Sequence, residues 1–354
     1  MHAQTSSTRL RRRWLRAVLT LAAGAFLLLG GMTLWLLRDP APWFAERRSA
    51  LVAVEEGPVD VSAGHVSQPV RLRASSGLSV DLLVRAPDSP PKEDLAPAAE
   101  EPSPVGDDPE AAGAGASSPL SRGKDGSGGR PLLLILGGYR TGEQAAMLVE
   151  DTRGTVVAAM AYPYDGPVNI EGLAVLKYVP RIRRALLDTP PAVQLALDYL
   201  LSRSDVDPTR VELVGVSFGS FFAAVAAVLD QRVTRLWLIH GAGQPYKLFE
   251  HGLRRFVPYR APRAVVAAVA NVLAAGPRLA PELWVPQVAP RPVIMINALD
   301  DERLPREAVE ALYASAREPK EQIWLPGQHV QPNRQEVVRQ LVDVVLSRAA
   351  EPPD

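Results

Sequence analysis

Hydrophobic and polar positions divide the chain into stretches of different character. An uncharged apolar run extends from Ala17 to Leu37. Residues 88–129 consist mostly of Pro, Ala, Gly, Ser, Asp and Glu, with few bulky apolar side chains. In residues 130–350, short apolar runs alternate with segments whose apolar positions recur every three or four residues. The pattern predicts an apolar N-terminal span, an insertion without a core of its own and one main folded domain.

The apolar run at residues 17–37 is long enough to cross a bilayer, because about twenty helical residues rise roughly 30 Å. The basic leader, residues 1–16, contains five arginines, so the positive-inside rule keeps it in the cytoplasm. We expect a single-pass transmembrane signal anchor that leaves the rest of the chain on the non-cytoplasmic side, periplasmic or extracellular in a bacterium. A cleaved signal peptide and a buried core helix are the alternatives, but no cleavage pattern follows the run.

Two segments separate this span from the main domain. Residues 38–87 form a juxtamembrane segment with an early β-hairpin, since apolar and polar residues alternate from Leu78 to Arg85. Residues 88–129 are expected to be a disordered surface insertion, because their composition offers too little apolar surface to stabilise a fold.

Residues 130–350 alternate between strand and helix patterns. Strands are expected at Leu132–Leu136, Thr155–Met160, Val211–Val216, Val233–Ile239, Val293–Asn297 and Gln322–Leu325. Helices are expected at Ala192–Leu201, Phe218–Leu229, Val309–Ala316 and Glu336–Ser347. Buried strands that alternate with helices predict an α/β domain with a mostly parallel central sheet flanked by helices. Functional groups gather at the carboxyl ends of such strands, so the residues after each strand matter most.

Composition excludes several classes of function. The 39 Lys and Arg residues balance the 39 Asp and Glu residues, so no overall attraction to nucleic acid follows. The chain has no cysteine, which excludes disulfides, a thiol nucleophile and thiolate metal sites. No metal-ligand spacing or phosphate-binding loop stands out, and we expect neither a metal nor a cofactor. The pattern does not indicate an oligomeric state.

The predicted strand Val211–Val216 runs into Gly215-Val216-Ser217-Phe218-Gly219, and a helix follows. In a turn this sharp the serine has a strained backbone, and side chains two residues before and after it would collide. Gly215 and Gly219 remove that collision. The Ser217 hydroxyl then projects from the sheet edge, and the Phe218 amide points to where an oxyanion would form. Ser217 is the candidate nucleophile; a glycine-rich turn with a capping serine is the alternative.

A serine nucleophile needs a histidine base and an acid that orients the histidine. Of five histidines, only His329 comes late enough for the chain order serine, acid, histidine. The acid is expected after the strand Val293–Asn297, where Asp300, Asp301 and Glu302 compete.

A second amide donor for an oxyanion is expected after the strand Leu132–Leu136. Gly137 and Gly138 follow it, and glycines let backbone amides approach a substrate carbonyl. The amide of Tyr139 is the first candidate donor, and that of Gly138 is the second. An ordinary strand-to-helix turn is the alternative.

Residues 131–350 resemble the α/β-hydrolase superfamily. The resemblance rests on Gly137-Gly138, on the elbow Gly215 to Gly219, on the D-E-x-L-P pattern Asp301–Pro305, and on His329 in Gly327-Gln328-His329. The chain is most similar to dienelactone hydrolases and prolyl-oligopeptidase-like serine esterases, in which a stretch such as Asp207–Val211 is typical before the elbow. The D-E-x-L-P pattern implies that Asp301, rather than Asp300, is the acid. Ser220 departs from the third glycine of many relatives, and Leu136 replaces the histidine of their His-Gly-Gly entry.

Residues 241–290 are expected to form a lid over the site, with an apolar helix at Arg263–Leu273; a plain packing helix is the alternative. The segment carries several arginines that could meet an anionic headgroup or form a solvated basic face: Arg254, Arg255, Arg260 and Arg263.

The function that this resemblance implies is that of a membrane-anchored serine hydrolase. A Ser217–His329–Asp301 triad would cleave a carboxylic ester or thioester of a small-molecule or lipid-like acyl substrate through an acyl-enzyme. A serine peptidase is one alternative, although residues 38–87 are too short for the propeller domain of prolyl oligopeptidases. A catalytically silent fold used for binding or scaffolding at the membrane is the other.

Overall fold

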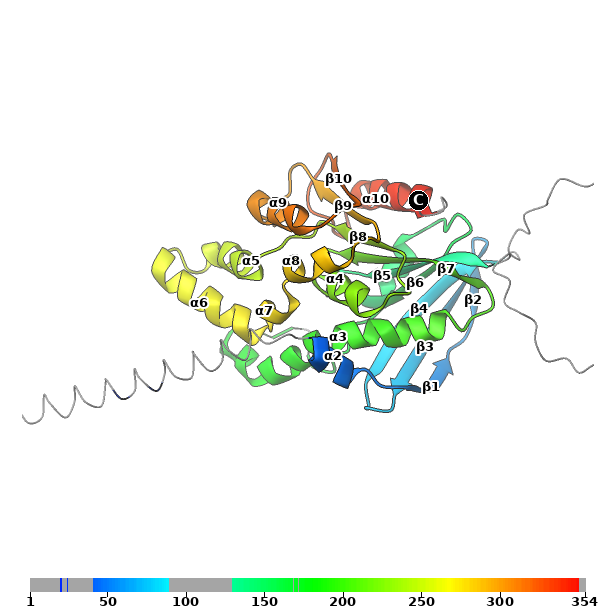
Figure 1. Ribbon diagram of the computed structural model, residues 1–354, viewed down its shortest axis with the longest axis horizontal. Helices are drawn as coiled ribbons and strands as arrows, with labels where there is room; N and C mark the ends of the chain where they lie inside the picture. Colours follow the sequence, from blue (N-terminus) through cyan, green and yellow to red (C-terminus); the bar gives the residue numbers. More distant parts are fainter. Residues whose placement is uncertain are drawn as a thin grey trace, which may run out of the picture.

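A ten-stranded β-sheet with helices on both faces runs through a computed structural model of the chain (Figure 1). The structure describes residues 20, 24, 41–88, 129–167, 169–170 and 172–349. The strands are β1 (Leu51–Glu56), β2 (Asp60–Ser62), β3 (His65–Ala74), β4 (Ser79–Pro87), β5 (Arg130–Leu136), β6 (Val156–Met160), β7 (Val206–Val216), β8 (Arg235–Ile239), β9 (Val293–Ala298) and β10 (Lys320–Leu325).

The strands follow the order β1-β3-β4-β6-β5-β7-β8-β9-β10, with β2 paired to β3. From β6 to β10 all neighbours are parallel, whereas β1 to β4 and the β4–β6 pair are antiparallel. Every residue of β5, β6 and β8 is buried, as expected for strands that are covered on both faces. The parallel half therefore aligns the carboxyl ends of the six strands β5 to β10 along one edge.

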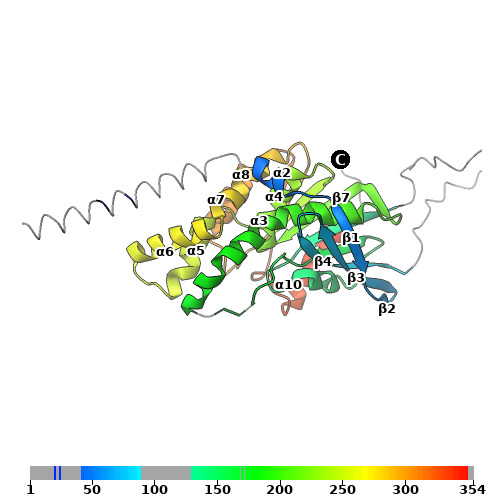
Figure 2. The ribbon, with the colours of Figure 1, turned by 90° about the horizontal axis from the view of Figure 1, so that it is seen from below.

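Helices cover both faces of this sheet. Their bounds are α2 (Ala41–Arg47), α3 (Val175–Leu200), α4 (Gly219–Leu229), α5 (Pro245–Gly252), α6 (Arg260–Leu273), α7 (Gly276–Leu279), α8 (Pro281–Trp284), α9 (Arg306–Ser315) and α10 (Gln335–Ala349). Helices α3 and α4 pack into a core on one face, and α10 packs with the 3-10 helix η1 (Gly142–Leu148) on the other (Figure 2). Helices α5 to α7 lie beyond one end of the sheet (Figure 1).

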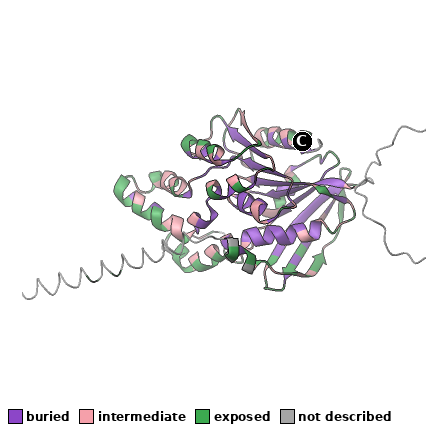
Figure 3. Cartoon of the chain, in the orientation of Figure 1, coloured by how far each residue is buried: buried purple, intermediate pink, exposed green. Residues whose placement is uncertain are grey.

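The antiparallel strands continue the same sheet. Residues 51–87, which the sequence assigned to a segment before the main domain, join it where Leu82 to Arg85 of β4 pair with Val157 to Met160 of β6. Their exposure alternates along the chain (Figure 3): β3 mixes buried and exposed residues, and β1 alternates between intermediate and exposed residues before it ends exposed. The alternation in the sequence showed half-buried strands, but it could not show which strand they pair with.

The predicted α/β class, with a mostly parallel central sheet flanked by helices, is confirmed. Helix α3 begins at Val175, well before the predicted start at Ala192. The prediction began too late because Pro180, Pro190 and Pro191 lie inside the helix, and proline usually ends a helix pattern. The predicted leader, the span at 17–37 apart from residues 20 and 24, and most of the 88–129 insertion lie outside the described residues. Among the residues that are described, no helix is both long and apolar enough to span a bilayer.

Candidate active site

Ser217 lies in a tight turn between β7 and α4, at the carboxyl edge of the sheet. Its backbone φ of 53° is in the left-handed region, which is uncommon for residues other than glycine. The turn is fixed on both sides, because the Ser217 amide donates to the Ile239 carbonyl (2.8 Å) and the Ser220 amide donates to the Ser217 carbonyl (3.2 Å). The strained conformation that the sequence predicted is therefore present and is held by the neighbouring strand β8.

The two elbow glycines are required by close contacts. A Cβ atom on Gly219 would lie 1.9 Å from the Leu136 carbonyl oxygen, and one on Gly215 would lie 2.6 Å from the Ala223 Cβ. Neither partner is the end of a flexible side chain, so neither can move aside at small cost. The elbow therefore excludes every residue but glycine at both positions.

Ser220, where many α/β-hydrolase relatives have a third glycine, fits for a specific reason. Its side chain is buried, and its hydroxyl donates to the Ser217 carbonyl at 2.6 Å. The space comes from Gly241 on the next loop, since a Cβ on Gly241 would lie 2.9 Å from both side-chain atoms of Ser220. This departure from the common pattern thus adds a hydrogen bond to the elbow.

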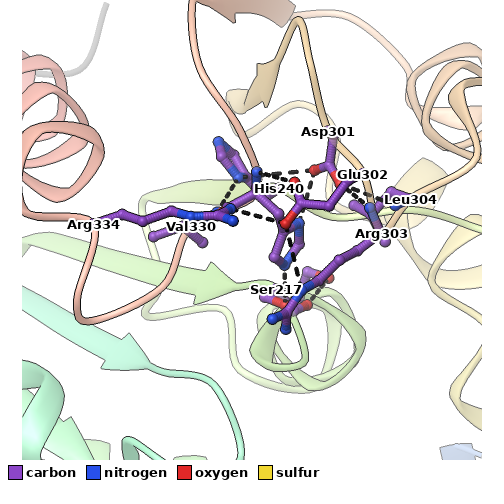
Figure 4. A network of polar contacts seen from close by, with 10 residues as sticks. Ser217, His240, Asp301, Glu302, Arg303, Leu304, Val330 and Arg334 are labelled. Atoms are coloured by element: carbon purple, nitrogen blue, oxygen red, sulfur yellow. Dashed lines mark hydrogen bonds and ion pairs between the residues drawn. The ribbon is translucent and has the colours of Figure 1, made fainter.

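His329 and Asp301 come together with Ser217, as the sequence predicted (Figure 4). The Ser217 Oγ lies 2.7 Å from His329 Nε2, and His329 Nδ1 lies 2.7 Å from Asp301 Oδ2. The second oxygen of Asp301 accepts the amides of Arg303 (2.8 Å) and Leu304 (2.9 Å). The carboxyl that meets His329 is that of Asp301 and not that of Asp300, which is exposed.

Hydrogen bonds keep the Asp301 carboxylate charged. Burial acts to raise the pKa of Asp301, but the hydrogen bond from His329 and the two backbone amides outweigh burial and hold the pKa below its usual value. An ionised Asp301 accepts the Nδ1 proton of His329. The imidazole then presents the lone pair of Nε2 to the Ser217 hydroxyl, which is the arrangement that a general base requires.

Glu302 and Arg334, which Figure 4 labels, bind the backbone of the His329 loop. One oxygen of Glu302 accepts the His329 amide at 3.0 Å, and the other accepts from Arg334 Nη1 at 2.9 Å. Arg334 Nη1 also donates to the His329 carbonyl at 2.5 Å. Both backbone groups of His329 are therefore bound. Burial acts to raise the pKa of Glu302, but these bonds lower it overall.

His240 supports the same loop from inside the protein. This side chain is 1% exposed, and its Nδ1 accepts the Val330 amide at 2.8 Å. Burial, together with the charge of His329, lowers the pKa of His240 to about 4, although Asp301 and Glu302 oppose this. His240 is neutral at physiological pH, as an acceptor at Nδ1 must be.

The three residues whose amides the sequence proposed as oxyanion donors border the same cavity as Ser217. Gly138, Tyr139 and Phe218 all line it, and within the described part of the chain no acceptor takes the amide protons of Tyr139 or Phe218. Tyr162, which follows β6, donates its hydroxyl to the Gly137 carbonyl. Burial raises the pKa of Tyr162, so the phenol stays protonated and fixes the glycine loop.

The cavity beside Ser217 has a volume of about 1030 Å³. Its wall includes Phe218 of the elbow, Val330 of the His329 loop and Gly252 at the end of α5. Residues of the predicted 241–290 lid therefore reach the site. Arg263 does not, because it is buried and bonded to Glu250 (3.2 Å), which corrects its grouping with the surface arginines of this segment.

One group of potential metal ligands occurs among the described residues. His240, Asp301 and His329 bring one ligand atom each within 4.8 Å of the others. These atoms already bind protein partners: the His329 Nδ1 bonds to Asp301, and the His240 Nδ1 bonds to Val330. The residues therefore fit a hydrogen-bond network better than a metal, and the expectation of no metal stays a prediction.

Comparison with known proteins gives partial sequence matches and a match of the whole fold. No family model matches the chain. The uncharacterized protein YfhR of Escherichia coli is 30% identical over 165 residues, which cover 44% of this chain and 51% of that protein. The putative hydrolase YtaP of Bacillus subtilis is 28% identical over 123 residues, which cover 33% of this chain and 36% of that protein. The chain thus matches about half, or less, of the length of these curated relatives.

The solved structure of an acetyl xylan esterase from Paenibacillus matches most of the chain. Its TM-score is 0.55 at 16% sequence identity, and the match covers 87% of this chain and 94% of the esterase. The chain has the α/β-hydrolase fold. The predicted resemblance is confirmed at that level, and the elbow, His329 and Asp301 occupy the strand ends at which an α/β-hydrolase carries its triad.

Sequence reasoning missed the residues that hold the α/β-hydrolase site in place. His240 directly follows β8 and Tyr162 lies just after β6, so their position after a strand was the available signal. Glu302 was considered as an acid, yet its part is to bind the His329 amide. Each of these contacts joins loops far apart in sequence, which a linear pattern does not reveal.

Proposed function

We propose that the protein is a serine hydrolase that cleaves a carboxylic ester or thioester through an acyl-enzyme on Ser217. The observation that carries the proposal is the continuous chain of short contacts from Ser217 Oγ through His329 to Asp301, both at 2.7 Å, on a strained elbow. The esterase among the structural neighbours and the putative hydrolase YtaP support the same class of reaction.

The first half of the reaction transfers the acyl group. The Ser217 oxygen attacks the carbonyl carbon while His329 Nε2 takes the hydroxyl proton, and Asp301 stabilises the resulting imidazolium. The amides of Phe218 and Tyr139, with Gly138 as the alternative, donate to the oxyanion of the tetrahedral intermediate. As the intermediate collapses, the bond to the leaving oxygen or sulfur breaks, and His329 returns the proton to it.

The second half releases the acid. Water attacks the acyl-enzyme carbonyl and gives a proton to His329 Nε2, and the ester bond to Ser217 then breaks. The serine oxygen recovers its proton from His329, so protons and electrons balance over the cycle and no cofactor takes part. The polar contacts that hold His329 serve both halves, since the imidazole acts once as a base and once as an acid in each.

A fluorophosphonate probe tests the proposal, because it reacts covalently with an activated serine. Wild type should be labelled and should hydrolyse p-nitrophenyl butyrate, whereas Ser217→Ala should lose the label and about 10⁴- to 10⁶-fold of its kcat. Ser202→Ala is the matched control, since Ser202 is exposed and bonds only the Tyr199 carbonyl at 2.7 Å in the described structure. If wild type labels no better than Ser217→Ala, the protein is a silent fold that serves binding or scaffolding.

We further propose that residues 17–37 anchor this hydrolase in a membrane as a single-pass span with the catalytic domain on the non-cytoplasmic side. The support is the uncharged apolar run and the arginine-rich leader. Full-length protein should stay with membranes after alkaline carbonate extraction, and a variant starting at residue 38 should be released. Release of the full-length protein would overturn the anchor.

A further inference from the structure

Arginines from three loops converge on the cavity beside Ser217. Arg140 follows β5, Arg303 follows β9, and Arg254 and Arg255 belong to the short helix η3 (Leu253–Arg255) after α5. All four line the cavity and are exposed. In Figure 4 the Arg303 side chain runs past Glu302 toward Ser217. The sheet edge and the lid thus each contribute guanidinium groups to the same opening.

The charge of these arginines is largely uncompensated. In the described part of the chain no carboxylate lies within 4.0 Å of Arg140, Arg254 or Arg255, whereas exposed arginines elsewhere are commonly paired, as Arg306 is with Glu310 at 2.8 Å. Arg140 and Arg255 lie over aromatic rings of their chain neighbours, at 5.4 and 4.7 Å, which leaves their charge in place.

A single acidic residue lines this cavity within the described chain, and its charge is already shared. Glu302 approaches Arg303 Nε at 3.8 Å, but its oxygens also accept from Arg334 at 2.9 Å and from the His329 amide at 3.0 Å. One carboxylate therefore faces four guanidinium groups on the cavity wall and a fifth at Arg334. The opening carries an excess of positive charge in a protein whose total charge is zero.

The rest of the cavity wall has the opposite character. Its partly accessible aliphatic side chains come from η1, β7, the His329 loop and α10: Leu148, Val216, Val330, Val338 and Val342. An elongated ligand would therefore meet apolar side chains at one end and guanidinium groups at the other. Ser217 lines the same cavity.

We propose that the natural substrate is an acyl ester or thioester whose leaving-group side carries an oxyanion, a carboxylate or a phosphate, that Arg140, Arg254, Arg255 and Arg303 bind. This rests on the proposed function. The acyl chain occupies the aliphatic part of the cavity. Guanidinium groups suit this role because they remain charged and donate two parallel hydrogen bonds to a carboxylate or phosphate. Their field at the opening also increases the rate at which an anion enters.

A matched pair of substrates tests the proposal. 4-(Butanoyloxy)benzoate and its methyl ester share the scissile bond and the acyl group, and they differ in one negative charge on the leaving group. We expect wild type to hydrolyse the benzoate with a kcat/KM at least about tenfold above that of the methyl ester, with the difference mainly in KM, since several exposed ion pairs act together. Raising the salt concentration should reduce this ratio.

Substitutions then assign the preference to the arginines. Arg254→Gln and Arg255→Gln should each lower the ratio by about two- to fivefold, and the double variant should lower it further. Arg260→Gln is the matched control, because Arg260 lies at the start of α6, is exposed and does not line the cavity. A ratio near one in wild type, or a ratio that the double variant leaves unchanged, would overturn the proposal.

Two further readouts keep the result unambiguous. Fluorophosphonate labelling of Ser217 reports the proposed catalysis separately, so labelled protein without any preference for the benzoate rejects the anion site alone. Inhibition of benzoate hydrolysis by phosphatidylcholine vesicles that contain phosphatidic acid, but not by inorganic phosphate, assigns the oxyanion to a lipid headgroup. The reverse result assigns it to a soluble phosphate or carboxylate ester, and either result requires the same arginines.

Discussion

The two sides of the Ser217 cavity are built on different physical principles. On the sheet side, His329 is 1% exposed, and backbone and side-chain partners fix Ser217, His329 and Asp301. On the lid side, residues 241–290 expose large side chains such as Phe256 and Tyr259, which are 69% and 77% exposed. Under the proposed function, the sheet side sets the reaction geometry, whereas the predicted lid presents groups that can change without disturbing that geometry.

The lid is nevertheless held by bonds of its own. Arg263 of α6 donates to Glu250 of α5 and to the carbonyls of Val257 and Pro258, at 3.0 to 3.2 Å. These bonds join the two lid helices to each other rather than to the triad. Substitutions on the two sides should therefore have different consequences: on the sheet side they should abolish chemistry or folding, and on the lid side they should alter substrate preference.

The largest effect is expected from Asp301, the acid of the proposed triad. Asp301→Asn keeps the shape of the side chain but removes the charge that orients His329 and stabilises its imidazolium, so kcat should fall by about 10⁴-fold. Steady-state kinetics with p-nitrophenyl butyrate measure this. Asp300→Asn is the adjacent control: its side chain is exposed, and kcat should change by less than about threefold. Equal losses in both variants would mean that the assignment of Asp301 is wrong.

Two glycine-to-alanine substitutions compare how tightly the backbone is packed in the elbow on the sheet side and in the predicted lid. Gly219→Ala places a Cβ 1.9 Å from the Leu136 carbonyl, so the free energy of unfolding should fall by at least about 3 kcal/mol. Gly252→Ala, at the end of the lid helix α5, meets nothing within 4 Å and has a helical φ of −63°. Its stability should stay level or rise by up to about 1 kcal/mol.

Urea unfolding followed by circular dichroism measures both glycine variants. A loss at position 252 as large as that at 219 would show that the lid is packed as tightly as the elbow. The difference between the sides would then lie in their chemistry alone.

The sequence predicted the parts of the site that obey local rules. Ser217 between Gly215 and Gly219 follows from the sterics of one turn, and His329 follows from chain order. Asp300 and Asp301 satisfy the same local rules, so the choice between them needed a family pattern. The central strands were predicted because both of their faces are buried, which leaves continuous apolar runs in the sequence.

The parts that were missed depend on contacts between distant segments. His240 acts through Val330, and Tyr162 acts through Gly137, and no spacing in the sequence connects these pairs. The first half of α3 was not predicted, because Pro180, Pro190 and Pro191 lie inside it and local rules treat proline as the end of a helix. The sequence likewise contains several arginines in residues 241–290, but it does not indicate that Arg254 and Arg255 are the ones that line the cavity.

A smaller effect is expected from His240, which holds the triad loop without touching Ser217. Removing the acceptor in His240→Leu leaves the Val330 amide without its partner and should lower stability by about 1–3 kcal/mol and reduce kcat. His240→Asn should restore much of both, since its Oδ1 can accept where Nδ1 does and asparagine tolerates the positive φ of 47°. A leucine variant as active as the asparagine variant would remove this positioning role.

The protonation of His240 makes the stability of the protein depend on pH. The pKa of His240 is about 4 in the folded protein and 6.5 in the unfolded chain, so as the pH falls the unfolded chain binds this proton before the folded protein does. The stabilisation that comes from keeping His240 neutral is complete above pH 6.5. It is lost as the pH falls toward 4, and at pH 5 this lowers the free energy of unfolding by about 2 kcal/mol.

The lowered pKa values of Asp301 and Glu302 also reduce stability at low pH, but only below their ordinary values near pH 4. Urea unfolding at pH 7 and pH 5 should therefore show a loss in wild type that His240→Asn reduces, and equal losses in both proteins would mean that His240 is not held neutral by its burial.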